Sequence, residues 1–169
     1  MLERFYPRLY VDSASQVPYE TLWEKGYRGV IFDIDNTLVE HGEPADARAK
    51  ELFSRIHAIG FQTCLLSNNK EARVRPFAQG VKSAYLAKAG KPGRAGYERA
   101  MQRMGTNREN TLFVGDQLFT DVWGANRAGI FGILVRPINP KEEIQIVLKR
   151  FLERPILWAY RRKQRKGKG

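Results

Sequence analysis

The chain has 169 residues, 43% of them apolar, which fits one globular domain with a substantial core. No apolar run approaches the roughly 20 residues that span a bilayer, and the charged, proline-containing start is unlike a signal peptide. We therefore expect a cytoplasmic protein. Cys64 is the only cysteine, which excludes an intramolecular disulfide and a cysteine-based zinc site.

The net charge of +11 is concentrated near the C-terminus. Residues 151–169 hold seven Lys or Arg side chains against one acid, Glu153, which leaves +5 for the first 150 residues. A basic segment of this kind attracts polyanions, which include nucleic acid, anionic membrane surfaces and acidic proteins.

Strands and helices are predicted to alternate along most of the chain. Residues 1–28 are mixed, are interrupted by Pro7 and Pro18, and are expected to pack on the outside of the core. Apolar runs predict strands at 30–32, 62–66, 83–87, 111–114 and 131–135. Helical spacing and stop residues predict helices at 44–59, from 70 to before Pro76, at 92–104, at 118–128, and from Asn139-Pro140 to Pro155. The inner face of the last helix is expected to be Ile144, Val147, Leu148 and Phe151.

This alternation predicts a three-layer α/β/α, Rossmann-like fold around a parallel sheet of about five strands. We expect one domain over residues 1–155 and a basic C-terminal tail over residues 156–169.

Polar side chains follow several of the predicted strands. Asp33, Asp35 and Thr37 follow the first strand, Ser67 and Asn68 the second, and Asp116 and Asp121 the fourth, while Lys91 precedes a helix. The carboxyl ends of parallel strands share one edge of the sheet, so these groups can converge there. Carboxylates that bind Mg²⁺, with a lysine and a hydroxyl for phosphate oxygens, suit phosphoryl transfer. One carboxylate can attack phosphorus, and a second can act as acid and base.

Several of these residues also have a plainer interpretation. Ser67 and Asn68 are common loop residues, Lys91 is of a type that usually lies in solvent, and Asp121 fits the first turn of a helix. The convergence of all these groups at strand ends favours the site interpretation.

Four motifs in order resemble those of the haloacid dehalogenase (HAD) superfamily: Asp33-Ile34-Asp35-Asn36-Thr37, Ser67-Asn68-Asn69, Lys91-Pro92 and the segment Gly115 to Asp121. The last motif resembles subfamily IIIA, in particular its YqeG-type branch, which is related to phosphatidylglycerophosphate phosphatases. The resemblance covers about residues 5–140 and implies a phosphomonoester hydrolase with a HAD-like fold and a Mg²⁺ cofactor.

The resemblance also implies residue roles. Asp33 would be the nucleophile and a metal ligand, and Asp35 the acid/base that also lends its backbone carbonyl to the metal. Asp116 would be the remaining metal ligand, and Asp121 would orient metal-bound water or Lys91. On the substrate side, Ser67 and Lys91 would bind phosphate, joined by Asn68 and by Thr37, which supports the loop.

The spacing of the motifs leaves no room for a cap domain: 29 residues separate Thr37 from Ser67, and 23 separate Ser67 from Lys91. A capless site is open and suits a bulky substrate, such as a macromolecule or a lipid headgroup. The segment Ile156-Leu157-Trp158-Ala159-Tyr160 with the basic residues after it resembles an anchor for an anionic membrane, which would place the protein peripherally at the inner face of the membrane.

Several functions remain open from the sequence. The first is a Mg²⁺-dependent phosphatase acting on phosphatidylglycerophosphate. Alternatives are a phosphatase for nucleic-acid ends or soluble phosphometabolites, and a non-catalytic protein on the same fold that binds RNA or the ribosome through its tail. In the tail, the apolar part has a second interpretation, in which it packs on the domain.

Overall fold

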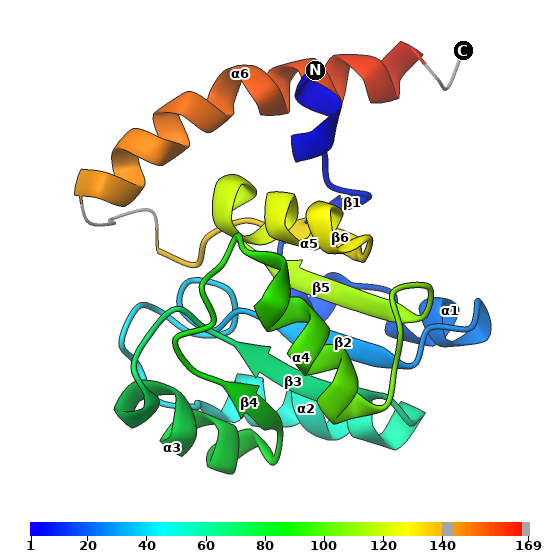
Figure 1. Ribbon diagram of the computed structural model, residues 1–169, viewed down its shortest axis with the longest axis vertical. Coiled ribbons are helices and arrows are strands. Elements are labelled where there is room, and N and C mark those ends of the chain that lie inside the picture. Colours follow the sequence, from blue (N-terminus) through cyan, green and yellow to red (C-terminus); the bar gives the residue numbers. More distant parts are fainter. Residues whose placement is uncertain (140–143, 167–169) are drawn as a thin grey trace.

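A six-stranded parallel sheet forms the centre of the protein (Figure 1). A computed structural model describes residues 1–139 and 144–166. The strands are β1 (Leu9–Val11), β2 (Gly29–Phe32), β3 (Gln62–Leu66), β4 (Ala84–Leu86), β5 (Thr111–Gly115) and β6 (Phe131–Val135). Their spatial order is β1-β6-β5-β2-β3-β4, and every neighbouring pair is parallel. The predicted three-layer α/β/α fold is confirmed.

The strand β1 was not expected from the sequence, which predicted about five strands. It pairs with β6 at the edge of the sheet, with Leu9 opposite Ile133 and Val11 opposite Val135. The three residues Leu9–Val11, which lie shortly after Pro7, are too few for a strand to be recognised from the sequence. They form a strand because they pair with the edge of β6.

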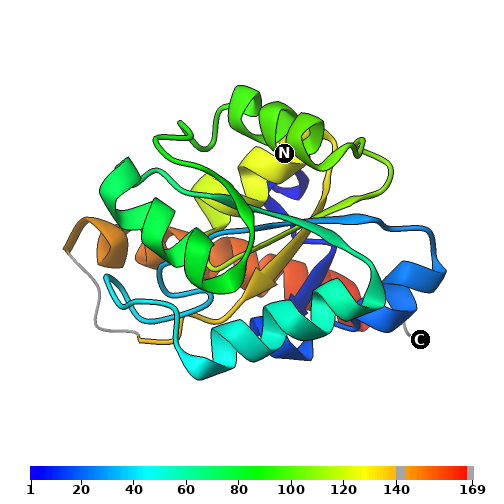
Figure 2. The same ribbon diagram turned by 90° about the horizontal axis from the view of Figure 1, so that it is seen from below.

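Helices cover both faces of the sheet (Figures 1 and 2). On one face, α1 (Tyr19–Glu24), α2 (Ala47–Ile59) and α3 (Glu71–Val81) pack on a core that includes Phe32, Phe53 and Phe77. On the other face, α4 (Arg94–Met104) and α5 (Trp123–Ala128) pack on a core that includes Ile31 and Tyr97. The long helix α6 (Ile144–Lys166) lies at the β1–β6 end, where Ile156 shares a cluster with Leu134.

Two prolines do not act as the sequence suggested. The helix α2 begins at Ala47 rather than at Pro44, because the Asp46 side chain caps it by accepting the N–H of Ala49 at 2.8 Å. The prediction that a helix ends before Pro76 is wrong, since α3 continues through it. The cost of Pro76 is offset by the buried face of α3, which consists of Val74, Phe77, Ala78 and Val81.

The prediction that Pro155 ends the last helix is also wrong, because α6 continues to Lys166. Packing on both sides of the proline holds the helix: Glu153 precedes it and Ile156 and Tyr160 follow it, and all three are buried. The expected boundary between a domain over residues 1–155 and a tail over residues 156–169 therefore falls inside one helix, α6. Phe151, expected on the inner face, is 64% exposed, while Pro140 and the side chains of Ile144, Val147 and Leu148 lie outside the described part.

Residues 38–90 contain only α2, β3, α3 and β4, which all belong to the core layers, so the expected absence of a cap domain is confirmed. In the described ranges, 1–139 and 144–166, no helix combines the length and hydropathy required to cross a membrane.

Candidate active site

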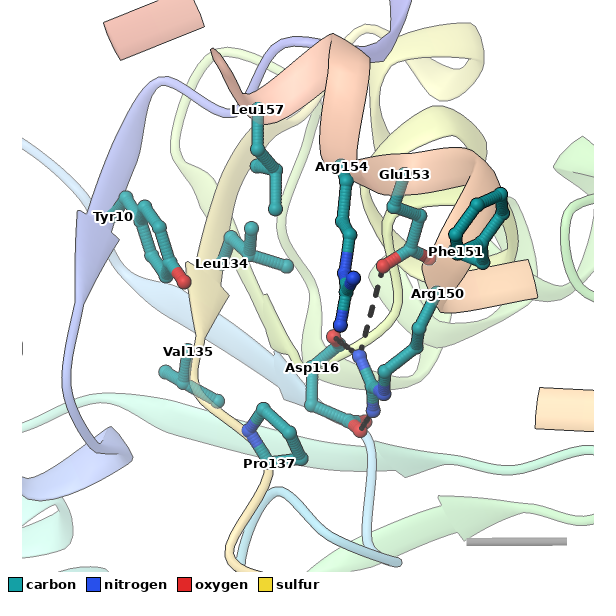
Figure 3. Close-up of a pocket in the computed structure, with 10 residues that line it drawn as sticks. All are labelled: Tyr10, Asp116, Leu134, Val135, Pro137, Arg150, Phe151, Glu153, Arg154 and Leu157. Carbon is teal, nitrogen blue, oxygen red and sulfur yellow. Dashed lines mark hydrogen bonds and ion pairs between the residues drawn. The ribbon is translucent and has the colours of Figure 1, made fainter. Parts of the chain in front are cut away.

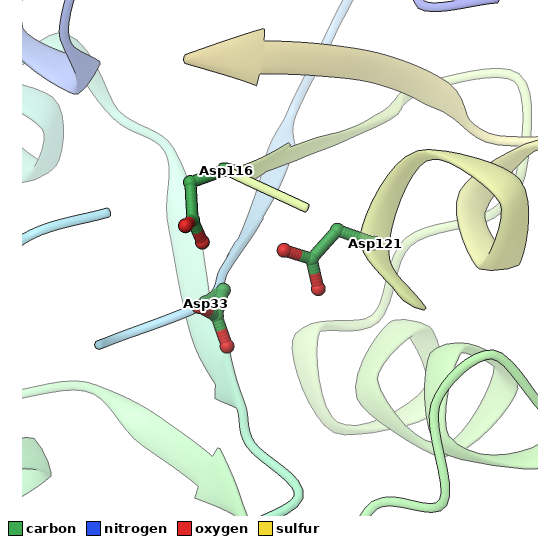
Figure 4. A group of neighbouring side chains, drawn as sticks. All are labelled: Asp33, Asp116 and Asp121. Atoms are coloured by element: carbon green, nitrogen blue, oxygen red, sulfur yellow. The ribbon is translucent and has the colours of Figure 1, made fainter. Parts of the chain in front are cut away.

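Three buried aspartates meet at the carboxyl edge of the two central strands (Figure 4). Asp33 follows β2, and its backbone N–H donates to the carbonyl of Val114 at 3.0 Å, which extends the pairing with β5. Asp116 follows β5 directly, so the sheet places the two carboxylates side by side. With Asp121, each offers an oxygen within 4.8 Å of the other two.

The Lys91 amine joins two of these aspartates. Its Nζ donates to Oδ1 of Asp33 at 2.6 Å and to Oδ1 of Asp121 at 2.7 Å, and its side chain is only 3% exposed. Burial opposes the charged amine, but the carboxylates of Asp121 and Asp33 outweigh burial and raise the pKa of Lys91. The amine is therefore a fixed positive charge beside Asp33.

Burial acts on the aspartates in the opposite direction, because it disfavours their charged forms. It raises the pKa of Asp33 to about 6, although Lys91 lowers it. The pKa of Asp116 is raised well above its usual range, first by burial and then by the neighbouring Asp33 and Asp121. The crowded carboxylates thus need positive charge to remain ionised together.

Asn68 holds the loop that carries Lys91. Its amide Nδ2 donates to the backbone carbonyl of Lys91 at 3.0 Å, and its Oδ1 accepts the Lys91 N–H at 2.8 Å. Both polar ends of the Asn68 amide are therefore engaged by the backbone of Lys91. The pair of bonds fixes where the lysine side chain enters the cluster.

Asp121 is positioned by a π-helical turn, Leu118–Val122, that follows β5. Its Oδ2 accepts the backbone N–H of Gln117 at 3.1 Å. The hydroxyl of Tyr97 lies 3.0 Å from the carbonyl of Thr120 and 3.1 Å from that of Asp121, which anchors the turn from α4. The carboxylate packs so closely on Gly115 that a Cβ there would lie 2.5 Å from Oδ2, so this position requires glycine.

Asp35 lies near the cluster but is not one of its three carboxylates. Its Oδ1 accepts from the backbone of Gly42 at 2.8 Å and from Arg73 at 2.9 Å, and its Oδ2 accepts from Asn69 at 2.7 Å. Sequence reasoning missed Asn69 and Arg73 as partners of Asp35. The signal that could have suggested them was position, because Asn69 ends the Ser67-Asn68-Asn69 motif and Arg73 follows it by four residues.

The two hydroxyls predicted at the site are both buried within it. The Oγ1 of Thr37 lies 3.1 Å from Oδ1 of Asp116 and 3.4 Å from Oδ2 of Asp33, so Thr37 ties the first motif to the last. The Oγ of Ser67, at the end of β3, accepts the backbone N–H of Asn69 at 3.1 Å. The structure thus brings the eight predicted site residues to one edge of the sheet.

Two further charged residues reach the site from α6, and neither was predicted to do so from the sequence. Arg150 forms an ion pair with the Asp116 carboxylate and donates to its backbone carbonyl at 2.8 Å. Glu153 is buried, accepts the Leu118 N–H at 3.0 Å, and lies 3.7 Å from the Arg150 guanidinium. The contacts join positions 34 or 35 residues apart, which no local pattern reveals.

Replacing Glu153 by glutamine is expected to flatten the pH dependence of stability. Burial raises the pKa of Glu153 to about 7, so the folded state holds a proton that the unfolded state releases near pH 4.5. Stability due to this group therefore falls as pH rises from about 4.5 through 7. We expect Glu153→Gln to gain stability relative to wild type by about 2 kcal/mol between pH 5 and pH 8, measured by urea unfolding of metal-free protein. A difference that does not change with pH would contradict this assignment.

The donor set of the cluster fits a divalent cation. Within the described residues, three carboxylates face two cations, Lys91 and Arg150, so one negative charge is not balanced. Carboxylate oxygens are the ligands that Mg²⁺ takes in phosphoryl-transfer sites. The excess negative charge and the raised pKa values are what a bound cation would relieve.

A solved structure resembles this fold, and a family profile matches the part of the chain that carries three of the site residues. The family described as HAD-hydrolase-like matches residues 88–137, which span Lys91, Asp116 and Asp121. The fold resembles that of the protein YfnB of Bacillus subtilis, with a TM-score of 0.52 at 12% identity over 71% of this chain and 91% of that one.

A relative that is matched over nearly its whole length shows the family. The probable phosphatase YqeG of Bacillus subtilis is 37% identical over 165 residues, which is 96% of each chain. The chloroplastic/mitochondrial phosphatidylglycerophosphate phosphatase 1 of Arabidopsis thaliana is 27% identical over 93% of this chain and 48% of its own length. The chain is a HAD-type phosphatase and belongs to the family of the YqeG phosphatase.

Proposed function

We propose that the protein is a Mg²⁺-dependent phosphomonoester hydrolase that acts through an aspartyl-phosphate on Asp33. The observation that carries the proposal is the position of Lys91, whose amine bridges Asp33 and Asp121 within 2.7 Å beside Asp116. A nucleophilic carboxylate next to a fixed positive charge can approach an anionic phosphate without strong repulsion.

In this mechanism an oxygen of Asp33 attacks phosphorus, and the bond from phosphorus to the leaving oxygen breaks. Asp35 gives a proton to the leaving oxygen and then takes one from the water that hydrolyses the aspartyl-phosphate. Lys91 and Ser67 bind the phosphate oxygens. Asn68 holds the loop that carries Lys91, and Thr37 holds the loop that follows Asp33. Mg²⁺, held by Asp33, Asp116 and the backbone of Asp35, would neutralise phosphate charge, and Asp121 would orient Lys91.

The substrate that we propose is a lipid phosphomonoester of the phosphatidylglycerophosphate type. Two observations support it: the Arabidopsis relative carries that activity in its name, and the site has no cap domain to exclude a bulky leaving group. The identity to that relative is 27%, so the lipid substrate is a more specific proposal than the phosphatase activity itself.

The outer side of α6 suits an anionic membrane surface. Phe151, Leu152 and Trp158 are 64%, 56% and 63% exposed, and the guanidinium of Arg162 lies 5.3 Å from the Trp158 ring. Exposed aromatic groups beside arginines favour the headgroup region of anionic lipid. The apolar residues of the C-terminal segment lie on two sides of α6: Ile156 and Tyr160 are buried on the domain, whereas Trp158 is exposed. The proposed anchor is therefore one side of the helix rather than a free tail.

A substrate panel tests the proposal. We expect phosphatidylglycerophosphate to be hydrolysed faster than a 5′-phosphorylated oligonucleotide or sugar phosphates, and faster still in vesicles with anionic lipid. Addition of EDTA should reduce every rate at least a hundredfold, and excess Mg²⁺ should restore it. Released phosphate is the measurement.

The other outcomes are equally informative. Preference for the oligonucleotide or for a sugar phosphate would replace the lipid substrate while leaving the phosphatase chemistry in place. Full activity in EDTA would contradict the metal assignment. If Mg²⁺ is present and no phosphomonoester is hydrolysed, a binding role through the basic part of α6 replaces catalysis.

A further inference from the structure

A cavity of about 330 Å³ lies between α6 and the β1–β6 end of the sheet, and it begins at Asp116 (Figure 3). One side is formed by Tyr10 of β1 and by Leu134 and Val135 of β6, and the other by residues of α6. The volume is at the lower end of the range typical of small-ligand pockets. Its position makes it an extension of the catalytic site.

Apart from Asp116 and the charged residues of α6, the lining of the cavity is mostly apolar. Leu157, Leu134 and Pro137 contribute aliphatic surface, and Tyr10 contributes an aromatic ring. Such a wall favours hydrocarbon and gives little binding energy to a sugar or to free inorganic phosphate. The wall therefore indicates a substrate with an apolar part.

Arg154 brings positive charge to the same cavity. Its side chain extends from α6 in the direction of Asp116 (Figure 3), and among the described residues no carboxylate pairs with it. Arg150, in contrast, already holds Asp116 and lies near Glu153. A guanidinium binds a phosphate diester with charge-assisted hydrogen bonds, so Arg154 is suited to an anion beyond the phosphate that is removed.

We propose that this cavity binds the leaving group of an amphiphilic phosphomonoester, with Arg154 on a second, phosphodiester anion and the apolar wall on the adjoining chain. The assignment rests on the proposed phosphatase function and adds a specificity site to it. A soluble phosphometabolite would not use the apolar wall, and an uncharged apolar chain would not use Arg154. A ligand that carries both a phosphodiester and an apolar chain contacts both Arg154 and the apolar wall.

Binding of a product-like probe tests the proposal without turnover. The probe is dihexanoyl phosphatidylglycerol, which carries one phosphodiester and two short chains, used as monomers with Mg²⁺-loaded protein in calorimetry. We expect it to bind at least fivefold more tightly than glycerophosphoglycerol, which lacks the chains. We expect the same preference over dihexanoylglycerol, which carries the chains but no phosphodiester.

The variant Arg154→Gln should weaken binding of the phosphatidylglycerol probe about five- to tenfold and leave binding of dihexanoylglycerol unchanged. Lys149→Gln is the matched control, because it removes the same charge from an exposed position of α6 outside the cavity and should keep wild-type affinity. Circular dichroism checks that both variants are folded. Equal affinity of Arg154→Gln and wild type for the probe, or no preference for the anionic lipid, would overturn the proposal.

Failure of this inference is distinguishable from failure of the proposed function. The binding measurement requires no catalysis, whereas the phosphatase proposal depends on turnover of any phosphomonoester. Turnover with no probe preference would remove the cavity assignment alone. Probe binding with no turnover of any phosphomonoester would keep the lipid site and remove the catalytic mechanism.

Discussion

Replacing Asp33 by asparagine is expected to reduce turnover by a factor of about 10⁴ or more, because the amide cannot attack phosphorus. The fold should persist, since asparagine has nearly the same shape and Lys91 keeps its 2.7 Å contact with Asp121. The measurement is steady-state phosphate release with the best substrate of the panel. Rapid acid quenching with radiolabelled substrate should trap labelled wild-type protein and no labelled variant.

Asp12→Asn is the matched control for this experiment. Asp12 is exposed and pairs with Arg136 at 2.8 Å on the surface, so its loss should change turnover less than twofold. Retention of more than a tenth of wild-type activity in Asp33→Asn would contradict the nucleophile assignment. Labelled protein in that variant would show that another side chain accepts the phosphoryl group.

Replacing Lys91 by methionine is expected to impair both catalysis and folding. The change leaves the Asp33 and Asp121 carboxylates buried without the amine that contacts both of them. Breaking a buried ion pair in this way costs about 3–5 kcal/mol, and we expect a loss of that size in the free energy of unfolding at pH 7. Turnover should fall about 10²- to 10³-fold, because the phosphate loses a buried positive charge.

The stability lost in Lys91→Met should depend on pH and on Mg²⁺, because the loss is electrostatic in origin. Lys91 lowers the pKa of Asp33, so its removal raises that pKa further, and the variant should regain stability as pH falls and Asp33 takes up a proton. Added Mg²⁺ should also restore part of it at pH 7. Urea unfolding at pH 5.5 and 7, with and without Mg²⁺, measures both effects. Lys88→Met is the control, as an exposed lysine in the same loop. A deficit that neither acid nor Mg²⁺ reduces would indicate simple mispacking of methionine.

The central strands and the motif residues could be predicted because their signals are local. The run Val30-Ile31-Phe32 is apolar without interruption, as a strand covered on both faces requires, and Asp33 follows it at once. The structure brings together Asp33, Asp116 and Lys91, as the parallel topology implied. Their catalytic roles stay predictions until the variants are measured.

The prolines show where local reasoning fails. Pro76 and Pro155 each oppose a helix, and from the sequence alone a break at either position is the expected result. Helices α3 and α6 nevertheless continue, because buried residues on both sides of each proline, such as Val74 and Phe77, contribute more than the proline costs. Only tertiary packing determines that balance.

The sequence by itself determined the alternation of strands and helices, the absence of a cap and the residues at the strand ends, because these depend on neighbours along the chain. Only the tertiary structure placed Arg150 and Glu153 against the Asp116 edge and enclosed a cavity beneath α6. These features join segments more than 30 residues apart, and their energy comes from burial and charge pairing that arise once the helix has docked.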